Sequence, residues 1–184
     1  MSDFWTYLDT FAPHLPWTHW VVMGLVALAS AWICLGRKRT SAYGAVALGL
    51  TVFIGLYLLD ALALARYWGV VPIWHRAGID LGAEWDLLLH GGSVRRIEML
   101  ANALVFVPFG FFLSMFLASA KRSGAWRRIG LVALSALGLS LCIEFLQLAL
   151  HLGFFELTDL VMNTAGAVAG AAIMLYRPER ATHF

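Results

Sequence analysis

The stretch that decides the fold runs from Gly138 to Gly170 and reads GLSLCIEFLQLALHLGFFELTDLVMNTAGAVAG. It contains two apolar segments that carry acidic and amide side chains. Glu144 and Gln147 are three residues apart, and Asp159 and Asn163 are four apart, so each pair projects from one face of a helix. Carboxylates and amides are costly inside a membrane span and usually face a protein interior or a watery cavity. We therefore expect the functional site in these two segments.

The composition around this stretch is that of an integral membrane protein. The chain is 61% hydrophobic and only 13% charged, and its apolar runs reach about 20 residues, the length that spans a bilayer. We predict an all-α polytopic bundle of about five transmembrane helices, forming one domain over residues 18–176, with spans at 18–36, 43–64, 97–120, 129–151 and 157–176. The remaining segments are a non-cytoplasmic leader at 1–17, an outer loop at 65–96 and a cytoplasmic tail at 177–184.

The distribution of basic residues predicts the orientation of this bundle. Five spans put the two termini on opposite sides of the membrane. With the N-terminus outside, nine of the thirteen Lys and Arg residues lie on the inner side, namely Arg37, Lys38, Arg39, Lys121, Arg122, Arg127, Arg128, Arg177 and Arg180. Because cytoplasmic segments carry the excess of Lys and Arg, we predict that the N-terminus is outside and the C-terminus is cytoplasmic.

This orientation collects the polar residues of the spans near one side of the membrane. At about 1.5 Å of rise per residue, seven of them fall within the outer ~12 Å of the bundle. They are Asp60, Glu98, Asn102, Glu144, Gln147, Asp159 and Asn163. The inner half of the bundle is almost purely apolar. The pattern predicts a cavity that opens to the outside and does not cross the whole membrane.

Glu144 is the deepest of these acids. A charge at the bilayer centre costs about 2.5–3.5 kcal/mol on insertion scales, so Glu144 must be paired, hydrated or protonated. Gln147 and Asn163 are candidate donors to it, and Asp159 is a candidate to share its proton. Two coupled carboxylates would suit general acid–base catalysis. The alternative is purely structural, because interhelical polar contacts in membranes contribute about 0.6 kcal/mol each.

The chain offers little for a metal ion or a cofactor. Glu144, Asp159 and Asn163 supply oxygen ligands of the kind that Ca²⁺ or Mg²⁺ prefers, and His151 ends the fourth predicted span. No HExxH or similar spacing occurs, and a histidine at that place is typical of the membrane interface. We predict no metal and no cofactor. Nucleophile–histidine arrangements, glycine-rich phosphate loops and nucleic-acid-binding features are also absent from the sequence.

Four arginines lie on the predicted outer side: Arg66, Arg76, Arg95 and Arg96. Guanidinium groups bind phosphate bidentately, so these side chains are candidates to hold the head group of a phosphorylated lipid. The alternative is ordinary snorkelling of arginine at the interface.

Other residues predict how the helices pack. Pro108 lies in the middle of the third span and predicts a kink there, because it removes a backbone hydrogen bond. Gly110 allows a neighbouring helix to approach closely. Gly166 and Gly170 form a small-xxx-small face that serves packing within the bundle or, as the alternative, a homodimer seam.

Three blocks in order resemble the VanZ-like family of membrane proteins. They are Asn102-Ala-Leu-Val-Phe-Val-Pro108-Phe-Gly110-Phe-Phe-Leu, Ser140-Leu-Cys-Ile-Glu144-Phe-Leu-Gln147, and Glu156-Leu-Thr-Asp159-Leu-Val-Met-Asn163-Thr-Ala-Gly166-Ala-Val-Ala-Gly170. The resemblance covers residues 95–176; the first two spans match only as apolar helices. It departs from the family pattern before the fifth span, where an arginine and a run of aspartates are common. Here Leu152-Gly153-Phe154-Phe155 stands instead, followed by Glu156.

The resemblance implies a role at the bacterial cell envelope, in the cytoplasmic membrane, and an association with lowered susceptibility to teicoplanin-type glycopeptide antibiotics. Three functions remain open. The first is recognition of a lipid-linked or cell-surface ligand by the outward cavity, with Glu98, Arg95, Arg96, Asn102, Gln147 and Asn163 as ligand-binding residues. The second is an enzyme with Glu144 and Asp159 as its acid–base pair. The third is a scaffold for other envelope enzymes. The expected partners are membrane lipids, a lipid-linked envelope precursor, and a membrane protein or second copy.

Overall fold

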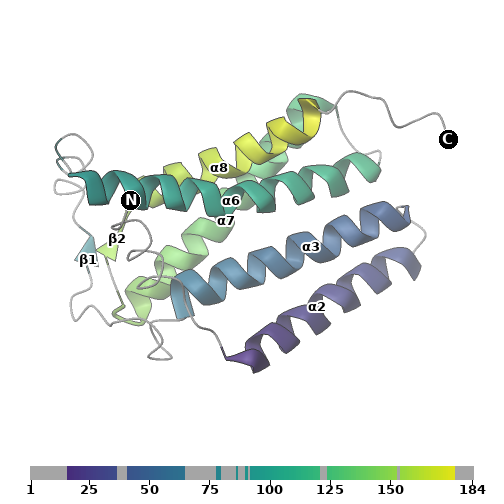
Figure 1. The fold of residues 1–184 in the computed structure, drawn as a ribbon, viewed down its shortest axis with the longest axis horizontal. Coiled ribbons are helices and arrows are strands. Elements are labelled where there is room, and N and C mark those ends of the chain that lie inside the picture. The colour runs from purple at the N-terminus through teal and green to yellow at the C-terminus, as the bar shows by residue number, and fades with distance from the viewer. Residues whose placement is uncertain are drawn as a thin grey trace.

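The computed structural model is a bundle of long helices (Figure 1). It describes residues 16–36, 41–64, 78–79, 86, 90, 92–120, 124–152 and 154–176, with backbone alone at 78–79, 93–95 and 154. Five helices are long and apolar enough to cross a membrane, which confirms the predicted class. They are α2 (Trp17–Gly36), α3 (Ala42–Leu59), α6 (Ser93–Ser119), α7 (Ala125–Ala149) and α8 (Leu157–Tyr176).

Some predicted segments lie outside the described residues. These are the leader up to residue 15, the basic cluster at 37–40, most of the loop at 65–91 and the tail from 177 to 184. The orientation of the bundle in the membrane stays a prediction.

The helices alternate in direction, so one end of the bundle collects particular helix termini (Figure 1). At this end α3 continues into a short π-helical turn, η1 (Asp60–Leu64), and stops. The same end holds the last turn of α7 and the first turns of α2, α6 and α8. We call it the polar end. All seven polar residues singled out in the sequence lie in the half of their helix nearest to it.

Glycine sets the closest helix contact, between α6 and α8, which lie side by side in Figure 1. A Cβ at any of three glycines would overlap a backbone carbonyl oxygen of the facing helix: that of Ala103 for Gly166, of Val107 for Gly170 and of Ala167 for Gly110. Small residues let membrane helices approach until their backbones touch. The Gly166/Gly170 face therefore packs within the chain, against α6.

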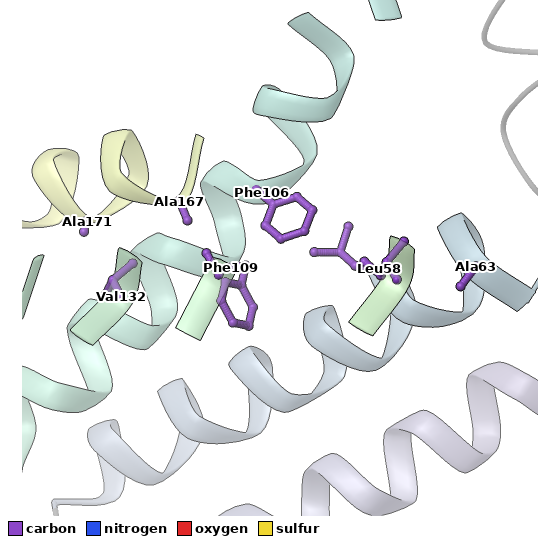
Figure 2. Close-up of a cluster of buried hydrophobic side chains, with 9 residues drawn as sticks. Leu58, Ala63, Phe106, Phe109, Val132, Ala167 and Ala171 are labelled. Atoms are coloured by element: carbon purple, nitrogen blue, oxygen red, sulfur yellow. The ribbon is translucent and has the colours of Figure 1, made fainter. Parts of the chain in front are cut away.

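The main core lies among α3, α6, α7 and α8. Figure 2 shows Phe106 and Phe109 of α6 at its centre, packed edge to face with ring centroids 6.1 Å apart. Residues from the other helices complete it, namely Leu58, Ala63, Val132, Ala136, Ile143, Ala167 and Ala171. Helix α2 contributes none of these. It joins the bundle through a smaller cluster in which Met23 packs on Phe53, Leu56 and Tyr57.

Pro108 is exposed within α6, and the helix continues through it. A kink at this proline stays a prediction.

A tight turn reverses the chain between α7 and α8. Two hydrogen bonds close the end of α7, from the Leu152 N–H to the Gln147 carbonyl (2.8 Å) and from the His151 N–H to the Leu148 carbonyl (3.2 Å). This is the Schellman pattern, in which the residue after the cap adopts a left-handed conformation. That residue is His151, with φ of 56°. After the turn, Phe154–Phe155 (β2) pairs in parallel with Gly78–Ile79 (β1) and so fastens part of the 65–92 segment to the polar end.

Replacing His151 with glycine should stabilise the protein by about 1 kcal/mol, because a left-handed residue with a side chain costs about 1–2 kcal/mol and glycine loses part of that gain through backbone entropy. Thermal unfolding in detergent measures the change. The matched control is Ala149→Gly, an exposed residue in the last turn of α7, which should destabilise the protein by about 1 kcal/mol. Equal losses for both variants would contradict the strain assigned to His151.

Candidate functional site at the polar end

Glu144 is held by the backbone of the helix that faces it. Its side chain projects from α7 toward α8 and is 1% exposed. Its Oε2 accepts a hydrogen bond of 2.8 Å from the N–H of Glu156, the residue that precedes α8. The first N–H groups of a helix have no partner within it, and the helix dipole places partial positive charge there. The start of α8 therefore compensates the buried carboxylate.

Asp159 lies in the first turn of α8 and turns toward α6. Its Oδ1 accepts a hydrogen bond of 2.7 Å from Asn102 Nδ2. Asp159 is on the same side of α8 as Gly166, where the two backbones touch, so the short Asn102 side chain reaches it. Both residues were candidates from the sequence, and the structure brings them together. An acid in the first turn also interacts favourably with the α8 dipole.

Asn163 lies one turn further along α8 and turns toward α7. It is 2% exposed, and its Nδ2 donates to Ser140 Oγ over 2.9 Å. The Oδ1 of Asn163 has no hydrogen-bond partner among the described residues. A buried acceptor without a partner costs about 1–3 kcal/mol. Ser140 is one turn from Glu144 on α7, so the Asn163 amide lies in the layer directly beneath the two carboxylates.

Gln147 ties α7 to the end of α3. Its Nε2 donates to the carbonyl oxygen of Leu62 in η1, over 2.8 Å. The last carbonyls of a helix lack intrahelical donors, so Gln147 satisfies one of them. The structure thus gives this residue, predicted to bind ligand, a contact between helices.

One polar pair at this end escaped the sequence analysis. His19 Nδ1 and Asp60 Oδ2 are 2.6 Å apart and join α2 to η1. Asp60 was noted as an outer acid, but His19 was not considered. The signal was present: His19 is near the start of the first span, Asp60 is near the end of the second, and a short connection makes these spans an antiparallel hairpin.

The remaining candidates lie at the start of α6 or outside the described residues. Arg96 is exposed in the first turns of α6, and Glu98, two residues further on, is partly buried. Arg66 and Arg76 lie outside the described residues, as does the side chain of Arg95. Within the described ranges, no three His, Cys, Asp or Glu side chains gather in a way that could hold a metal ion.

The polar side chains that α7 and α8 bring to this end are mostly hydrogen-bond acceptors. They present two carboxylates and the Asn163 carbonyl oxygen, all of which accept. The sequence has no Lys or Arg between Arg128 and Arg177, so α8 and the part of α7 at the polar end contribute no basic side chain.

A protein-family model described as VanZ/LLP1 matches residues 25–177. A curated relative, Protein VanZ of Enterococcus faecium, is 33% identical over 73 residues. This match covers 40% of the chain and 41% of the relative, so the aligned part spans less than half of that protein. No solved structure gives a significant match. The matching model is that of the family that the three sequence blocks resemble, which confirms the resemblance.

Proposed function

The chain belongs to the VanZ/LLP1 family, and from this premise we propose that its polar end recognises a lipid-linked or cell-surface ligand of the bacterial envelope. The protein is a multi-pass membrane protein. We place it in the cytoplasmic membrane with the polar end outside, because this orientation leaves most basic residues on the inner side. A link to teicoplanin-type glycopeptide susceptibility is part of the same proposal and rests on the family resemblance.

The observation that carries the proposal is the position of Glu144. A carboxylate that is 1% exposed within a membrane span is costly, and tying helices together does not require one, since neutral side chains such as Gln147 and Asn163 also link helices here. Intramembrane ionisable groups typically mark substrate or ion pathways. The chain has this acid, with Asp159 in the first turn of the facing helix α8, at the end where a ligand from outside would arrive.

Native mass spectrometry on gently solubilised protein tests the proposal. We expect a lipid or isoprenoid adduct on the wild type that falls at least about tenfold in the double variant Glu144→Gln, Asp159→Asn, equivalent to about 1.4 kcal/mol of binding. The matched control is Asp86→Asn, an acid whose side chain is 77% exposed, which should keep the adduct. In a teicoplanin-susceptible host, the same double variant should lose any change in susceptibility that the wild type confers, at equal protein levels.

Other outcomes contradict the proposal. An adduct retained by the double variant would remove the two acids from the binding site and leave the arginines of the predicted outer side as candidates, among them the exposed Arg96. A second protein that co-purifies in place of any adduct would favour the scaffold function. For that function, the exposed Ala165 and Ala169 on α8 are the residues to change, because Gly166 and Gly170 are already packed against α6.

An acid–base enzyme is the second candidate, favoured by the approach of Glu144 and Asp159 to the start of the same helix. Glu144 accepts from a backbone N–H and Asp159 accepts from the Asn102 amide, so the two carboxyl groups lie in different environments. Different environments separate the pKa values of two carboxyl groups, which lets one act as the acid and the other as the base. This function requires turnover of the captured lipid by purified protein, with a bell-shaped dependence on pH. Binding without any product would leave recognition as the function.

A further inference from the structure

The end of the bundle opposite the polar end has an excess of positive charge. It holds the last turns of α2, α6 and α8 and the first turns of α3 and α7 (Figure 1). Three long stretches of the sequence that meet there contain no Asp or Glu, namely 10–59, 99–143 and 160–178. In and beside these helix termini the sequence has nine Lys and Arg residues and one acid, Glu179. We call this end the basic end.

Arg128 lies on the face of α7 that is turned toward the core. It is one turn from Val132 and two turns from Ala136, which are both 0% exposed and belong to the main core. Residues four apart on a helix share a face. Arg128 itself is partly buried, whereas its neighbours Trp126 and Arg127 are exposed. Its side chain therefore starts from the inner side of α7 and not from the side that faces lipid.

The guanidinium group of Arg128 lacks an acceptor within the described part of the chain. Its Nε is buried and has no hydrogen-bond partner there. Every Asp and Glu that the structure describes lies at the polar end, apart from Asp86 in the segment before α6. Snorkelling keeps the charged head of an arginine in water, whereas part of this head is buried. A buried donor on a charged group is costly without an acceptor, so the arrangement favours a bound anion.

The start of α7 adds hydrogen-bond donors and positive potential at the same place. Helical side chains lean toward the N-terminus of their helix, so that of Arg128 extends toward the first turn. The first N–H groups of a helix have no partner within it and carry partial positive charge. Here the N-cap is Gly124, which makes no side-chain cap, and the first turn has no acid. Helix starts and guanidinium groups both bind phosphate.

We propose that Arg128 and the start of α7 bind a phosphate anion, either the head group of an anionic phospholipid in the adjacent leaflet or a phosphate free in solution. Nε–H and one Nη–H of Arg128 donate to two phosphate oxygens, and N–H groups of the first turn donate to a third. Trp126 and Tyr176 are 85% and 89% exposed at this end, as is typical of aromatic side chains at the level of the head groups. Basic pockets between membrane helices commonly bind anionic lipids.

Native mass spectrometry with added lipid tests the site. The purified protein is titrated with phosphatidylglycerol, a phospholipid with a net negative charge. We expect Arg128→Gln to lower the affinity for this lipid at least about tenfold, because it removes two charge-assisted hydrogen bonds. The matched control is Arg127→Gln, which makes the same change in net charge at an exposed neighbour. Its affinity should fall by less than about twofold.

Thermal unfolding gives a second readout, which tolerates a lower starting stability of the variants. A ligand that binds only the folded state raises the unfolding temperature. Phosphatidylglycerol should raise it for the wild type and Arg127→Gln and leave it unchanged for Arg128→Gln. Inorganic phosphate, added without lipid, distinguishes the two sources of the anion. A rise that requires Arg128 assigns the site to a soluble phosphate, and the absence of a rise, with an effect of phosphatidylglycerol, assigns it to the lipid.

Other results overturn the proposal. Equal losses of affinity in the two arginine variants would show a general attraction to surface charge, and an unchanged affinity in Arg128→Gln would show that this side chain binds no lipid. A third result concerns Glu179, which lies outside the described residues. If Glu179→Gln lowers the unfolding temperature as much as Arg128→Gln does, and neither phosphatidylglycerol nor phosphate raises that of the wild type, then Glu179 is the partner of Arg128.

The site at the basic end is independent of the proposed function. The double variant Glu144→Gln, Asp159→Asn changes only the polar end and should keep its affinity for phosphatidylglycerol. Arg128→Gln should in turn keep the adduct expected at the polar end. Each of the two proposals can therefore fail while the other holds.

Discussion

Gly166→Ala should destabilise the protein by about 3 kcal/mol, at the upper end of what overpacking a core usually costs. The added methyl group would overlap the carbonyl oxygen of Ala103. The obstacle is backbone within α6, which has no rotamer that could move aside, so α6 and α8 must separate. Separation would also strain the hydrogen bond between Asn102 and Asp159, which crosses the same interface. Denaturant-induced unfolding in mixed micelles, followed by tryptophan fluorescence, measures the loss.

The control for this change is Gly138→Ala on α7. A Cβ at Gly138 meets nothing within 4 Å, so the same substitution should leave stability unchanged or raise it by up to about 1 kcal/mol through helix propensity. If both variants lose the same amount, the cost comes from the helix backbone in general, and the close approach of α6 and α8 is not its cause.

Glu144→Ala should also cost about 3 kcal/mol, for a different reason. It leaves the partly buried Glu156 N–H without its Glu144 acceptor, which costs about 1–3 kcal/mol, and it opens a cavity between α7 and α8. Glu144→Gln keeps the volume and an oxygen that accepts from Glu156, so its cost should be about 1 kcal/mol or less. Unfolding of the three proteins under identical conditions measures both differences.

The comparison separates the structural role of Glu144 from its proposed function. We expect Glu144→Gln to accumulate as folded protein and yet to lose the adduct and the phenotype. If glutamine is as destabilising as alanine, the negative charge itself holds the start of α8. The loss of function in Glu144→Gln would then say nothing about ligand recognition.

The sequence predicted the parts of the fold that follow from hydrophobicity and residue size. Apolar runs of bilayer length predicted five spanning helices, as the structure has them. The alternating direction of the spans placed Asn102, Glu144 and Asp159 at the same end. The glycines at positions 110, 166 and 170 marked the closest helix contact, because only a residue without Cβ allows two backbones to touch.

The sequence did not predict the partner of each polar group, because hydrogen bonding depends on which helices are neighbours. Asn102 was not considered as a donor to Asp159, yet the two are hydrogen-bonded, since α8 packs most extensively on α6. That Asp159 shares a proton with Glu144 stays a prediction. The η1 turn and the left-handed His151 left no residue signal, because glycine, the usual marker of such a turn, stands two positions later at Gly153. The β1–β2 pairing joins segments more than seventy residues apart, beyond the reach of any local pattern.

The hydrogen bond to Glu144 Oε2 comes from the main-chain N–H of residue 156, so the sequence at position 156 can change during evolution without loss of this bond. Any amino acid at position 156 supplies the same donor, with the single exception of proline, which has no N–H. Substitutions at 156 therefore do not require compensation at 144, and paired substitutions that would reveal the contact in related sequences are not expected. The backbone donor to Glu144 is in this way independent of the side chain at position 156, and the segment before it, Leu152-Gly153-Phe154-Phe155, has no arginine.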